Sequence, residues 1–421
     1  TKYFSITLDM SLINAAAIGD ISLVKSCLSD GDDVNIPNSY GSTALHAAAS
    51  RGHEDVVWFL LSKANVNNDG RTALYLAARK GYTEIVRLLL SSGANANIIA
   101  NNGYTALHLA VKQGHTETVR LLLSKANMDV VDSKGRTALH ISVEQSHLEV
   151  LKILILSGAD VNIATTSGDT ALSYAAKNGN VDMVRMLILA GSFIDADTLS
   201  NAVSRGYTDI VQMLLIAGVD VNVKDTRGRA VLYRAVRSKN TEMVKILLLA
   251  GADVNAVRDC GNKALYNSVR DVTPLHFAVK DDNIDIVQIL LQAGADINAV
   301  DYYGNTALHH AGNADIAHML LQAGADINAV NKSGYTAVFN AMNNKDVDMT
   351  KMLINAGATM STNRGDSLLH AAASYGLVEI VELLLNEDNV NSTNDRGSTP
   401  LHKARTAEIV QMLIQAGADV N

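Results

Sequence analysis

Histidine recurs along the chain in one phrase, and histidine is the side chain best suited to move protons or bind a metal near neutral pH. Each copy follows a threonine or serine by three residues, at His46, His108, His140, His276, His309, His370 and His402. Because there is one copy per phrase, neighbouring copies fall in neighbouring structural units about 10 Å apart, too far for shared coordination at roughly 2 Å per bond. We therefore predict that each histidine hydrogen-bonds between its turn and the adjoining loop. The adjacent pair His309 and His310 cannot point the same way on a helix and is expected to have no special role.

Carboxylates that could act as acids or bases are equally repetitive. They occupy one position of the repeat, at Asp160, Asp220, Asp253, Asp296 and Asp326, where stabilisation of a turn explains them better than catalysis. The sequence has no glycine-rich phosphate loop, His-Glu-x-x-His or Gly-x-Ser-x-Gly motif. Cys27 and Cys260 belong to no Cys-x-x-Cys pair, which argues against a zinc site or a disulfide framework. We expect no catalytic residue, metal or cofactor in this chain, and hence no enzyme.

The composition narrows the class of protein. Of 421 residues, 48% are hydrophobic and 19% charged, which excludes a disordered chain. The longest apolar runs, such as 153–156, fall well short of the roughly 18 to 20 residues that span a bilayer. The chain begins at Thr1 with no basic-then-apolar leader. We expect a soluble protein in a reducing, intracellular setting.

An internal repeat then dictates the elements that carry these residues. A Gly-x-Thr-Ala-Leu-His-like phrase opens at Gly41, Gly70, Gly103, Gly135, Gly168, Gly228, Gly261, Gly304, Gly334, Gly365 and Gly397. In the unit that opens at Gly103, Thr105 is suited to cap a short helix, Gly114 breaks it, and a second amphipathic helix follows over 116–124. Most second helices end in Gly-Ala-Asp-Val/Ile-Asn, as at 158–162. Each unit is thus a helix, turn, helix and loop that can bury its apolar faces only by stacking on its neighbours.

These phrases resemble ankyrin repeats. The phrase Thr-Ala-Leu-His occurs at 43–46, 105–108, 137–140 and 306–309, with Gly-Ala-Asp-Val/Ile-Asn about 20 residues later. The match to the repeat covers essentially the whole chain. The resemblance implies an all-α repeat solenoid of about thirteen complete units and one partial unit, with antiparallel helix pairs, β-hairpin-like loops and a curved superhelix. The low cysteine content and the Thr-Ala-Leu-His variant, with few Thr-Pro-Leu-His, look more like arrays in secreted effectors of intracellular bacteria than like typical animal arrays.

Departures from the repeat divide this single array of residues 1–421. Residues 1–40 hold a degenerate N-terminal capping repeat, 41–197 regular repeats, 198–271 an irregular middle with a partial repeat at 261–271, and 272–421 further repeats without a C-terminal cap, as in a fragment of a longer protein. About three residues are missing between the helices near 311–313 and 403–405, which predicts shortened first helices there. Second helices that lead into Ser-Lys-Ala-Asn, at 62–65 and 124–127, lack the closing glycine and should end differently.

By the same resemblance, partners bind the concave face, here called the inner face. It comprises the two residues before the opening glycine, the residue after it, and the two residues before the inter-helix turn. Basic residues at these positions outnumber acidic ones by nine, so the rest of the chain carries 17 excess negative charges within the total of −8. The candidate partner-binding residues are Tyr40, Arg51, Arg71, Arg79, Lys80, Tyr104, Lys112, Lys134, Arg136, Lys177, Arg205, Arg227, Arg229, Arg237, Lys280, Tyr302, Tyr303, Tyr335, Arg364 and Tyr375.

This face predicts a scaffold that binds a protein partner, since Tyr and Arg are frequent interface anchors. An acidic partner segment suits the Arg/Lys part, and a more apolar segment suits the tyrosines that follow. The plainest competing interpretation is that Lys or Arg at these sites serves solubility alone. A eukaryotic cytoskeletal or membrane-protein adaptor also fits the pattern, as does an electrostatic single-strand nucleic-acid binder, although pI ≈ 5.8 disfavours nucleic acid. We expect a monomeric array in the cytoplasm or, for an effector, in the host cytoplasm or nucleus.

Overall fold

The computed structural model describes residues 11–67, 72–225, 228–257, 272–359, 365–385 and 389–420. Its contacts divide the chain into two compact units, unit 1 over Thr1–Thr198 and unit 2 over Leu199–Asn421. The partial repeat expected at 261–271 lies outside the described residues.

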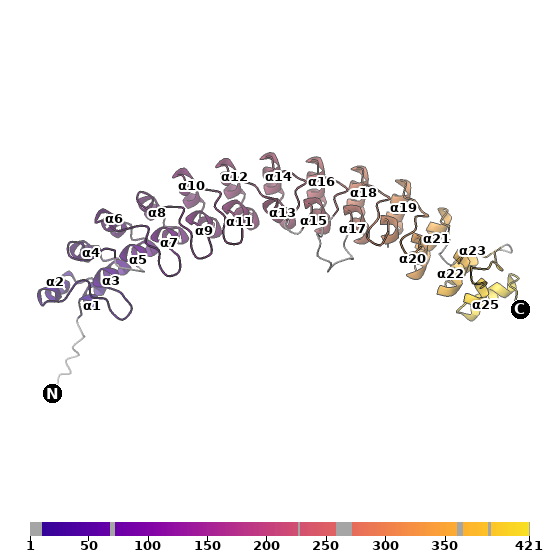
Figure 1. Cartoon of the computed structure of the whole chain (residues 1–421), viewed down its shortest axis with the longest axis horizontal. Helices are drawn as coiled ribbons and strands as arrows, with labels where there is room; N and C mark the ends of the chain where they lie inside the picture. Colours follow the sequence, from indigo (N-terminus) through magenta and orange to yellow (C-terminus); the bar gives the residue numbers. More distant parts are fainter. Residues whose placement is uncertain are drawn as a thin grey trace, which may run out of the picture. The chain divides into compact units, whose positions relative to one another are not determined.

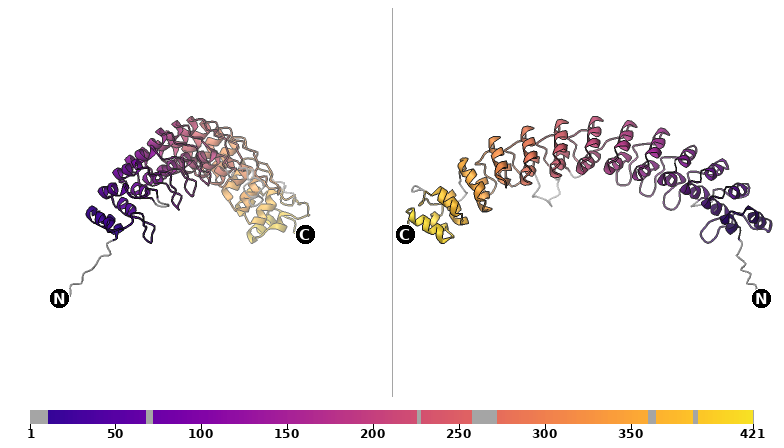
Figure 2. Two further views of the ribbon diagram at one scale, coloured as in Figure 1. Left: turned by 60° about the vertical axis from the view of Figure 1, so that its left-hand side comes forward. Right: turned by 180° about the vertical axis from the view of Figure 1, so that it is seen from behind.

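Unit 1 is a stack of helix pairs, each made of a first helix, a turn and a second helix (Figure 1). The first helices are α1 (Leu12–Ile18), α3 (Ala44–Arg51), α5 (Ala73–Lys80), α7 (Ala106–Lys112), α9 (Ala138–Glu144) and α11 (Ala171–Asn178). The second helices are α2 (Ile21–Ser29), α4 (Glu54–Leu61), α6 (Thr83–Ser91), α8 (Thr116–Leu123), α10 (Leu148–Leu156) and α12 (Val181–Leu189). Each helix contacts its partner and the matching helix of the next pair. The loops project beyond the row of first helices, which is also visible from behind (Figure 2).

Unit 2 repeats the same plan, and α13 (Ala196–Arg205) begins just before its boundary. Its further first helices are α15 (Val231–Arg237), α17 (Pro274–Lys280), the 3₁₀ helix η2 (Ala307–His310), α20 (Ala337–Asn343), α22 (Leu368–Tyr375) and α24 (Pro400–Lys403). Its second helices are α14 (Thr208–Ile216), α16 (Thr241–Leu249), α18 (Ile284–Gln292), α19 (Ala314–Gln322), α21 (Val347–Asn355), α23 (Val378–Leu384) and α25 (Ala407–Gln415). The all-α repeat fold that the sequence predicts is confirmed. Among the described residues, β structure is limited to one antiparallel bridge, between Lys224 and Ala230.

Side-chain size explains how the helices stack. First helices bury small residues, as α3 does with the fully buried Ala44, Ala48 and Ala49, so their backbones can approach closely. Second helices bury larger aliphatic residues, such as Val57 and Leu60 of α4. Since no pair covers both of its apolar sides alone, each pair is completed by its neighbours.

The recurrent histidine closes the start of a first helix and links it to the next repeat. In α7, the Thr105 hydroxyl lies 2.9 Å from His108 Nδ1, which also accepts the Thr105 backbone N–H. With Nδ1 accepting, the ring proton resides on Nε2, which donates to the Arg136 carbonyl of the next loop at 3.3 Å. The same pair of contacts recurs at His140, His276, His309 and His370. The predicted bond between turn and adjoining loop is thus confirmed.

Most described loop tips are held by an Asp or Asn that folds back on its own backbone, with Ala100 and Thr165 as exceptions at this position. Asp132 Oδ1 accepts the backbone N–H groups of Lys134 and Arg136, and its own N–H donates to the Arg136 carbonyl. Gly135 has φ +74°, and a Cβ there would lie 2.7 Å from the Thr166 backbone nitrogen of the next loop. Thr166 in turn donates its N–H to the Lys134 carbonyl at 3.1 Å. Successive loops therefore stack by direct backbone contact, which only glycine permits at this point.

A second link joins the ends of the second helices. Asn162 Oδ1 accepts the Phe193 N–H at 2.7 Å, and its Nδ2 donates to the Gly191 carbonyl at 3.4 Å. Equivalent asparagine-to-backbone bonds join Asn67 to Asn95 and Asn298 to Asp326. This amide ladder satisfies backbone groups that a helix end would otherwise leave unpaired.

The irregular repeats behave as their lengths predict. The two first helices that lack about three residues are only four residues long, η2 at Ala307–His310 and α24 at Pro400–Lys403. The second helices before Ser-Lys-Ala-Asn, α4 and α8, end one residue early, at Leu61 and Leu123, whereas α6 continues to Ser91. A local deletion is thus absorbed within one helix pair.

Candidate protein-binding face

The candidate residues of the inner face differ widely in exposure. Tyr40 is 90% exposed. The exposed basic residues are Arg51, Arg79, Lys80, Lys112, Lys134, Lys177, Arg205, Arg237 and Lys280. Tyr303 and Tyr335 are exposed, while Tyr104, Arg229, Tyr302 and Tyr375 are half-buried. Arg71, Arg227 and Arg364 lie outside the described residues.

Many exposed cations stand at one structural position, the last turn of a first helix. Arg51, Arg79, Lys112, Lys177 and Arg237 all occupy it. A cation there interacts favourably with the negative end of the helix dipole and stays in water. Each of these cations therefore stabilises the end of its own helix, and its charge remains available to a partner.

Arg136 departs from this pattern and corrects one of the predicted sites. Its side chain is buried, and it pairs with Asp132 at 2.8 Å and Glu144 at 2.5 Å while donating to the Tyr104 hydroxyl at 2.7 Å. Burial opposes the charged guanidinium, but the hydrogen bond to Asp132 and the charge of Glu144 together raise the pKa of Arg136. Although desolvation acts in the opposite direction, hydrogen bonds from Arg136 and the loop backbone lower the pKa of Asp132. Arg136 therefore fixes the loop to the helix pair, and its guanidinium group is already occupied by these internal contacts.

Two further loop aspartates accept hydrogen bonds from side chains at equivalent positions of their repeats. Asp225 pairs with Arg229 at 2.9 Å and also with Arg234. Asp301 accepts from His310 Nε2 at 2.9 Å. The sequence-based expectation that His310 has no special role is wrong, because this ring occupies the place that Arg234 takes in its own repeat. Like Arg136, Arg229 pairs with an aspartate of its own loop, Asp225.

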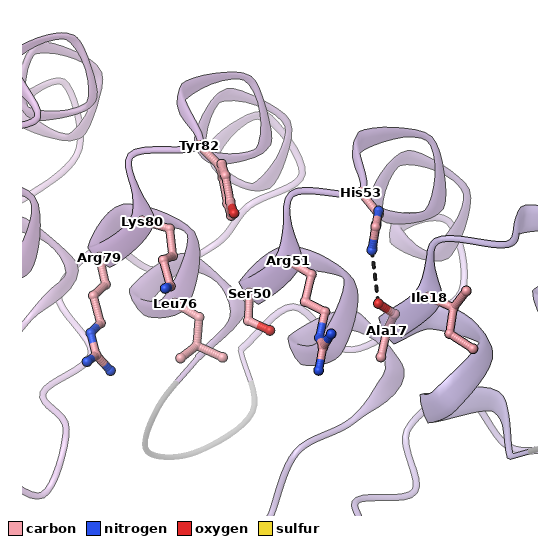
Figure 3. Close-up of a pocket in the computed structure, with 9 residues that line it drawn as sticks. All are labelled: Ala17, Ile18, Ser50, Arg51, His53, Leu76, Arg79, Lys80 and Tyr82. Atoms are coloured by element: carbon pink, nitrogen blue, oxygen red, sulfur yellow. Dashed lines mark hydrogen bonds between the residues drawn. The ribbon is translucent and has the colours of Figure 1, made fainter.

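An open groove lies between α1, α3 and α5 and the starts of the second helices (Figure 3). Its volume is about 820 Å³, and its lining comprises Ala17, Ile18, Ser50, Arg51, His53, Leu76, Arg79, Lys80 and Tyr82. Three of these side chains are cationic and none is acidic. In Figure 3, Arg51, Arg79 and Lys80 extend to the same side of their helices. The groove therefore offers several positive charges beside apolar walls.

The back of this groove was not predicted from the sequence. His53 Nε2 bonds to the Ala17 carbonyl at 2.9 Å, and the His53 ring covers Gly19, where a Cβ would come within 2.4 Å of the ring. Tyr82 covers Gly52 in the same way, at 2.9 Å. The signal was present, since His or Tyr follows the inter-helix glycine at His53, Tyr82, His115 and Tyr207. These rings hold adjacent repeats together and shape the groove at the same time.

Aromatic side chains gather in unit 2. Tyr335 stacks on Phe339 with ring centroids 4.0 Å apart and an interplanar angle of 4°, and Phe339 meets Tyr375 edge-on at 5.7 Å. Lys332 lies 4.7 Å from the centre of the Tyr302 ring. Phe339 was missed by the sequence analysis, although it replaces the recurrent histidine of its repeat. Two candidate tyrosines of the inner face, Tyr335 and Tyr375, thus form a three-ring cluster with Phe339.

Other kinds of site find no support in the described part of the chain. No group of three or more His, Cys, Asp or Glu side chains there is arranged to hold a metal ion. No described helix has the length and apolarity needed to cross a membrane. Cys27 is buried, and burial together with the nearby Asp32 and Asp30 raises the pKa of its thiol.

Comparison with known proteins gives short but consistent matches. The chain is 34% identical over 96 residues to the ANK repeat-containing protein nipk-1 of Caenorhabditis elegans, covering 18% of this chain and 16% of that protein. It is 40% identical over 50 residues to Notch-regulated ankyrin repeat-containing protein A of Danio rerio, covering 12% and 45%. The chain thus matches less than half the length of these curated relatives. The ankyrin repeat domain of Bcl-3 aligns with 27% identity and a TM-score of 0.46, covering 53% of this chain and all of that one.

Family models match most of the chain. The model for ankyrin repeats in three copies matches residues 12–100, 92–165, 199–272, 259–331 and 338–421, and the model for many copies matches 143–188 and 311–354. Together with the helix pairs, the Thr–His caps and the stacked loops, these matches place the chain in the ankyrin-repeat family.

Proposed function

We propose that this chain is a scaffold that binds a protein partner along its inner face, and that the groove between α1, α3 and α5 receives an acidic segment of that partner. Ankyrin repeats generally serve as protein-interaction modules, and the groove supplies the specific support. It gathers Arg51, Arg79 and Lys80 without an acidic side chain in its lining. Charge of one sign in a concave surface attracts a partner of opposite charge and orients it.

The spacing of these cations indicates the form of the acidic segment. Arg51 ends α3, whereas Arg79 and Lys80 end α5, so they project from adjacent first helices, whose axes lie roughly 10 Å apart. An extended chain advances about 3.3 Å per residue. Carboxylates three residues apart in an extended segment would therefore meet successive repeats.

The walls of the groove add affinity that charge alone does not give. Ile18 is 64% exposed, and Leu76 and Tyr82 contribute further apolar surface. An apolar partner side chain between the carboxylates would cover this surface, and exposed ion pairs alone contribute little free energy. We infer a partner segment that alternates acidic and apolar residues.

The aromatic cluster of unit 2 suits a more apolar part of a partner. Tyr335 and Tyr303 expose rings on rigid supports, since Tyr335 is stacked on Phe339 and Tyr303 packs on Tyr302 at 5.3 Å. Rigid aromatic rings are typical interface anchors because they lose little conformational entropy on binding. The biological setting we favour is the interior of a cell, with capture of a host protein by a bacterial effector as the specific hypothesis.

Charge reversal tests the groove. The variant Arg51→Glu/Arg79→Glu/Lys80→Glu should lose the partners that wild type retains in quantitative affinity capture, and should bind an extended peptide with Asp at every third residue at least tenfold more weakly. The charge-matched control Lys63→Glu/Arg87→Glu/Lys125→Glu changes exposed residues outside this groove and should bind like wild type.

Equal binding by both triple variants would contradict the proposal, as would loss of binding accompanied by loss of the helical circular dichroism signal. Mobility-shift assays with random single-stranded DNA at moderate salt separate protein binding from nucleic-acid binding. A shift that the groove variant abolishes would favour nucleic acid as the ligand instead.

A further inference from the structure

A second surface is marked by one residue position, the last residue or C-cap of each second helix. In unit 1 the position is serine at Ser29, Ser62, Ser91 and Ser124, and then changes to Leu156 and Leu189. In unit 2 it is Ile216 and Leu249, and then Gln292, Gln322, Asn355 and Gln415; α23 ends earlier, at Leu384, and the residue of its repeat that is equivalent by register, 386, lies outside the described residues. Four consecutive described repeats thus carry a large aliphatic residue where the other described repeats carry a polar one.

These aliphatic side chains are not part of the core. Leu156 and Leu189 are 77% and 81% exposed, and Ile216 and Leu249 are 87% and 88% exposed. Single exposed leucines are ordinary, but exposed leucines at one register position of neighbouring repeats form a row. The stack itself gains nothing from them, since serine or glutamine serves elsewhere.

Phe193 extends this row in unit 1. It is 70% exposed and stands where the other described repeats with this ladder bond have Asn, Asp or Thr. Its backbone N–H donates to Asn162 in the loop after α10, which fixes the backbone of Phe193 just beyond the end of α12. We call Leu156, Leu189 and Phe193 the outer row.

Charged residues border the outer row on one side. Lys152 and Arg185 precede Leu156 and Leu189 by four residues and so share their helix faces. Both cations are exposed, and no described carboxylate lies within ion-pair distance of either. One turn further on, Glu149 and Asp182 form an acidic line. The apolar row is thus flanked first by cations and then by anions.

This arrangement fits a helix that lies along the stack. Adjacent packed helices are roughly 10 Å apart, and seven residues of an α-helix rise about 10.5 Å. A partner helix with an apolar residue at every seventh position would therefore place one on each repeat, and acidic residues on one flank would meet Lys152 and Arg185. An anionic lipid surface fits less well, because it would also face Glu149 and Asp182.

We propose that the outer row is a docking surface for an amphipathic helix of a partner protein, with apolar residues at seven-residue spacing and an acidic flank. Ile216 and Leu249 give unit 2 a separate row of the same type. The surface is distinct from the inner face, so a partner can occupy it while the groove is occupied or empty.

The test uses residue types that the repeats themselves tolerate. Leu156→Ser/Leu189→Ser/Phe193→Asp reproduces the residues found at Ser124 and Asp160, so the fold should persist, as thermal unfolding would verify. The probe is a synthetic 24-residue helical peptide with Leu at every seventh position and Glu on one flank, and its binding is followed by fluorescence anisotropy. We expect the triple variant to bind at least tenfold more weakly than wild type. Ser124→Leu, which lengthens the row by one repeat, should bind about threefold or more tightly.

Charge exchange tests the flank. Lys152→Glu/Arg185→Glu should weaken the Glu-flanked peptide and strengthen a Lys-flanked one, whereas the groove variant Arg51→Glu/Arg79→Glu/Lys80→Glu should leave both unchanged. Equal binding of a scrambled peptide, or no loss in the triple variant, would overturn the proposal. So would a wild-type dimer that the triple variant converts to a monomer, which would assign the row to a second copy, or vesicle binding that the variant abolishes, which would assign it to lipid.

Discussion

At the scale of residues, the recurrent histidine forms hydrogen bonds both in its own repeat and in the next one. Its Nδ1 closes the helix start and its Nε2 donates to the next loop, as at His276 with the Asn305 carbonyl at 3.0 Å. Burial lowers the pKa of His108, His140, His276 and His309 more than their carbonyl partners raise it. The fold therefore requires these rings to be neutral.

This requirement predicts a pH dependence of stability. In the unfolded chain the imidazoles titrate near their ordinary pKa of about 6.5. As the pKa is lower in the fold, the unfolded chain takes up protons first when the pH falls, so stability is complete above about pH 6.5 and declines below it. The midpoint of thermal unfolding should change little between pH 7.5 and about 6.5 and fall from there to pH 5.5. The double variant His108→Gln/His140→Gln should start lower at pH 7.5 and show a shallower decline; equal slopes for both proteins would contradict this account.

Prediction from sequence at this scale was right for the recurrent histidine and did not foresee the contacts of Arg136. Thr105 and His108 are three residues apart, so their bond follows from helix geometry. Arg136 was expected to face a partner, but it is held by Asp132, Glu144 and Tyr104, and Glu144 and Tyr104 are reached only through the loop fold. The remaining candidate residues of the inner face stay predictions.

At the scale of elements, a missing stretch shortens a single first helix. η2 is a four-residue 3₁₀ helix where α17, one repeat earlier, is a seven-residue α-helix. Deletion of the helix end removes the equivalent of Val279, which is fully buried in α17. The shortening was predictable from residue counts, whereas the hydrogen bond between His310 and Asp301 was not, because it depends on where the adjacent loop folds.

Restoring this helix should stabilise unit 2. Insertion of Val-Lys-Asp after Ala311 rebuilds the length seen in α17 and returns a buried valine, which contributes about 1.5 to 3 kcal/mol when fully buried. We expect a higher midpoint of thermal unfolding and a stronger helical signal in far-ultraviolet circular dichroism. Insertion of Gly-Ser-Gly at the same place adds length without an apolar contact and should give neither gain. A lower midpoint for the Val-Lys-Asp protein would show that the neighbouring repeats are adapted to the short helix.

At the scale of the whole molecule, excess positive charge is assigned to the inner face and excess negative charge to the rest of the chain. The sequence assigns nine excess basic residues to the inner face of a chain whose total is −8. The structure moves Arg136 and Arg229 into internal pairs, which leaves mainly cations at the ends of first helices, such as Arg51 and Lys80. The predicted limits of the regular and irregular segments, including the division near residue 198, stay predictions about domain organisation.

This division predicts how association with an acidic partner responds to salt. Screening shortens the reach of the basic face from about 30 Å at 0.01 M to about 3 Å at 1 M ionic strength. The association rate constant of the acidic peptide should therefore fall steeply as salt rises, while the dissociation rate changes less. Stopped-flow measurements on wild type and the groove variant would check this, and a rate constant that is independent of salt in wild type would contradict it.

Side chains link neighbouring repeats in both directions along the chain. The histidine of one repeat bonds forward to the next loop, the amide of Asn162 bonds forward to Gly191 and Phe193, and the ring of Tyr82 covers Gly52 behind it. The hydrogen bonds and apolar contacts of each repeat are thus completed by the repeat that follows it. During synthesis on the ribosome, the most recently emerged repeat would always be incomplete, and its open carbonyl and amide groups would be satisfied only when the next repeat leaves the exit tunnel.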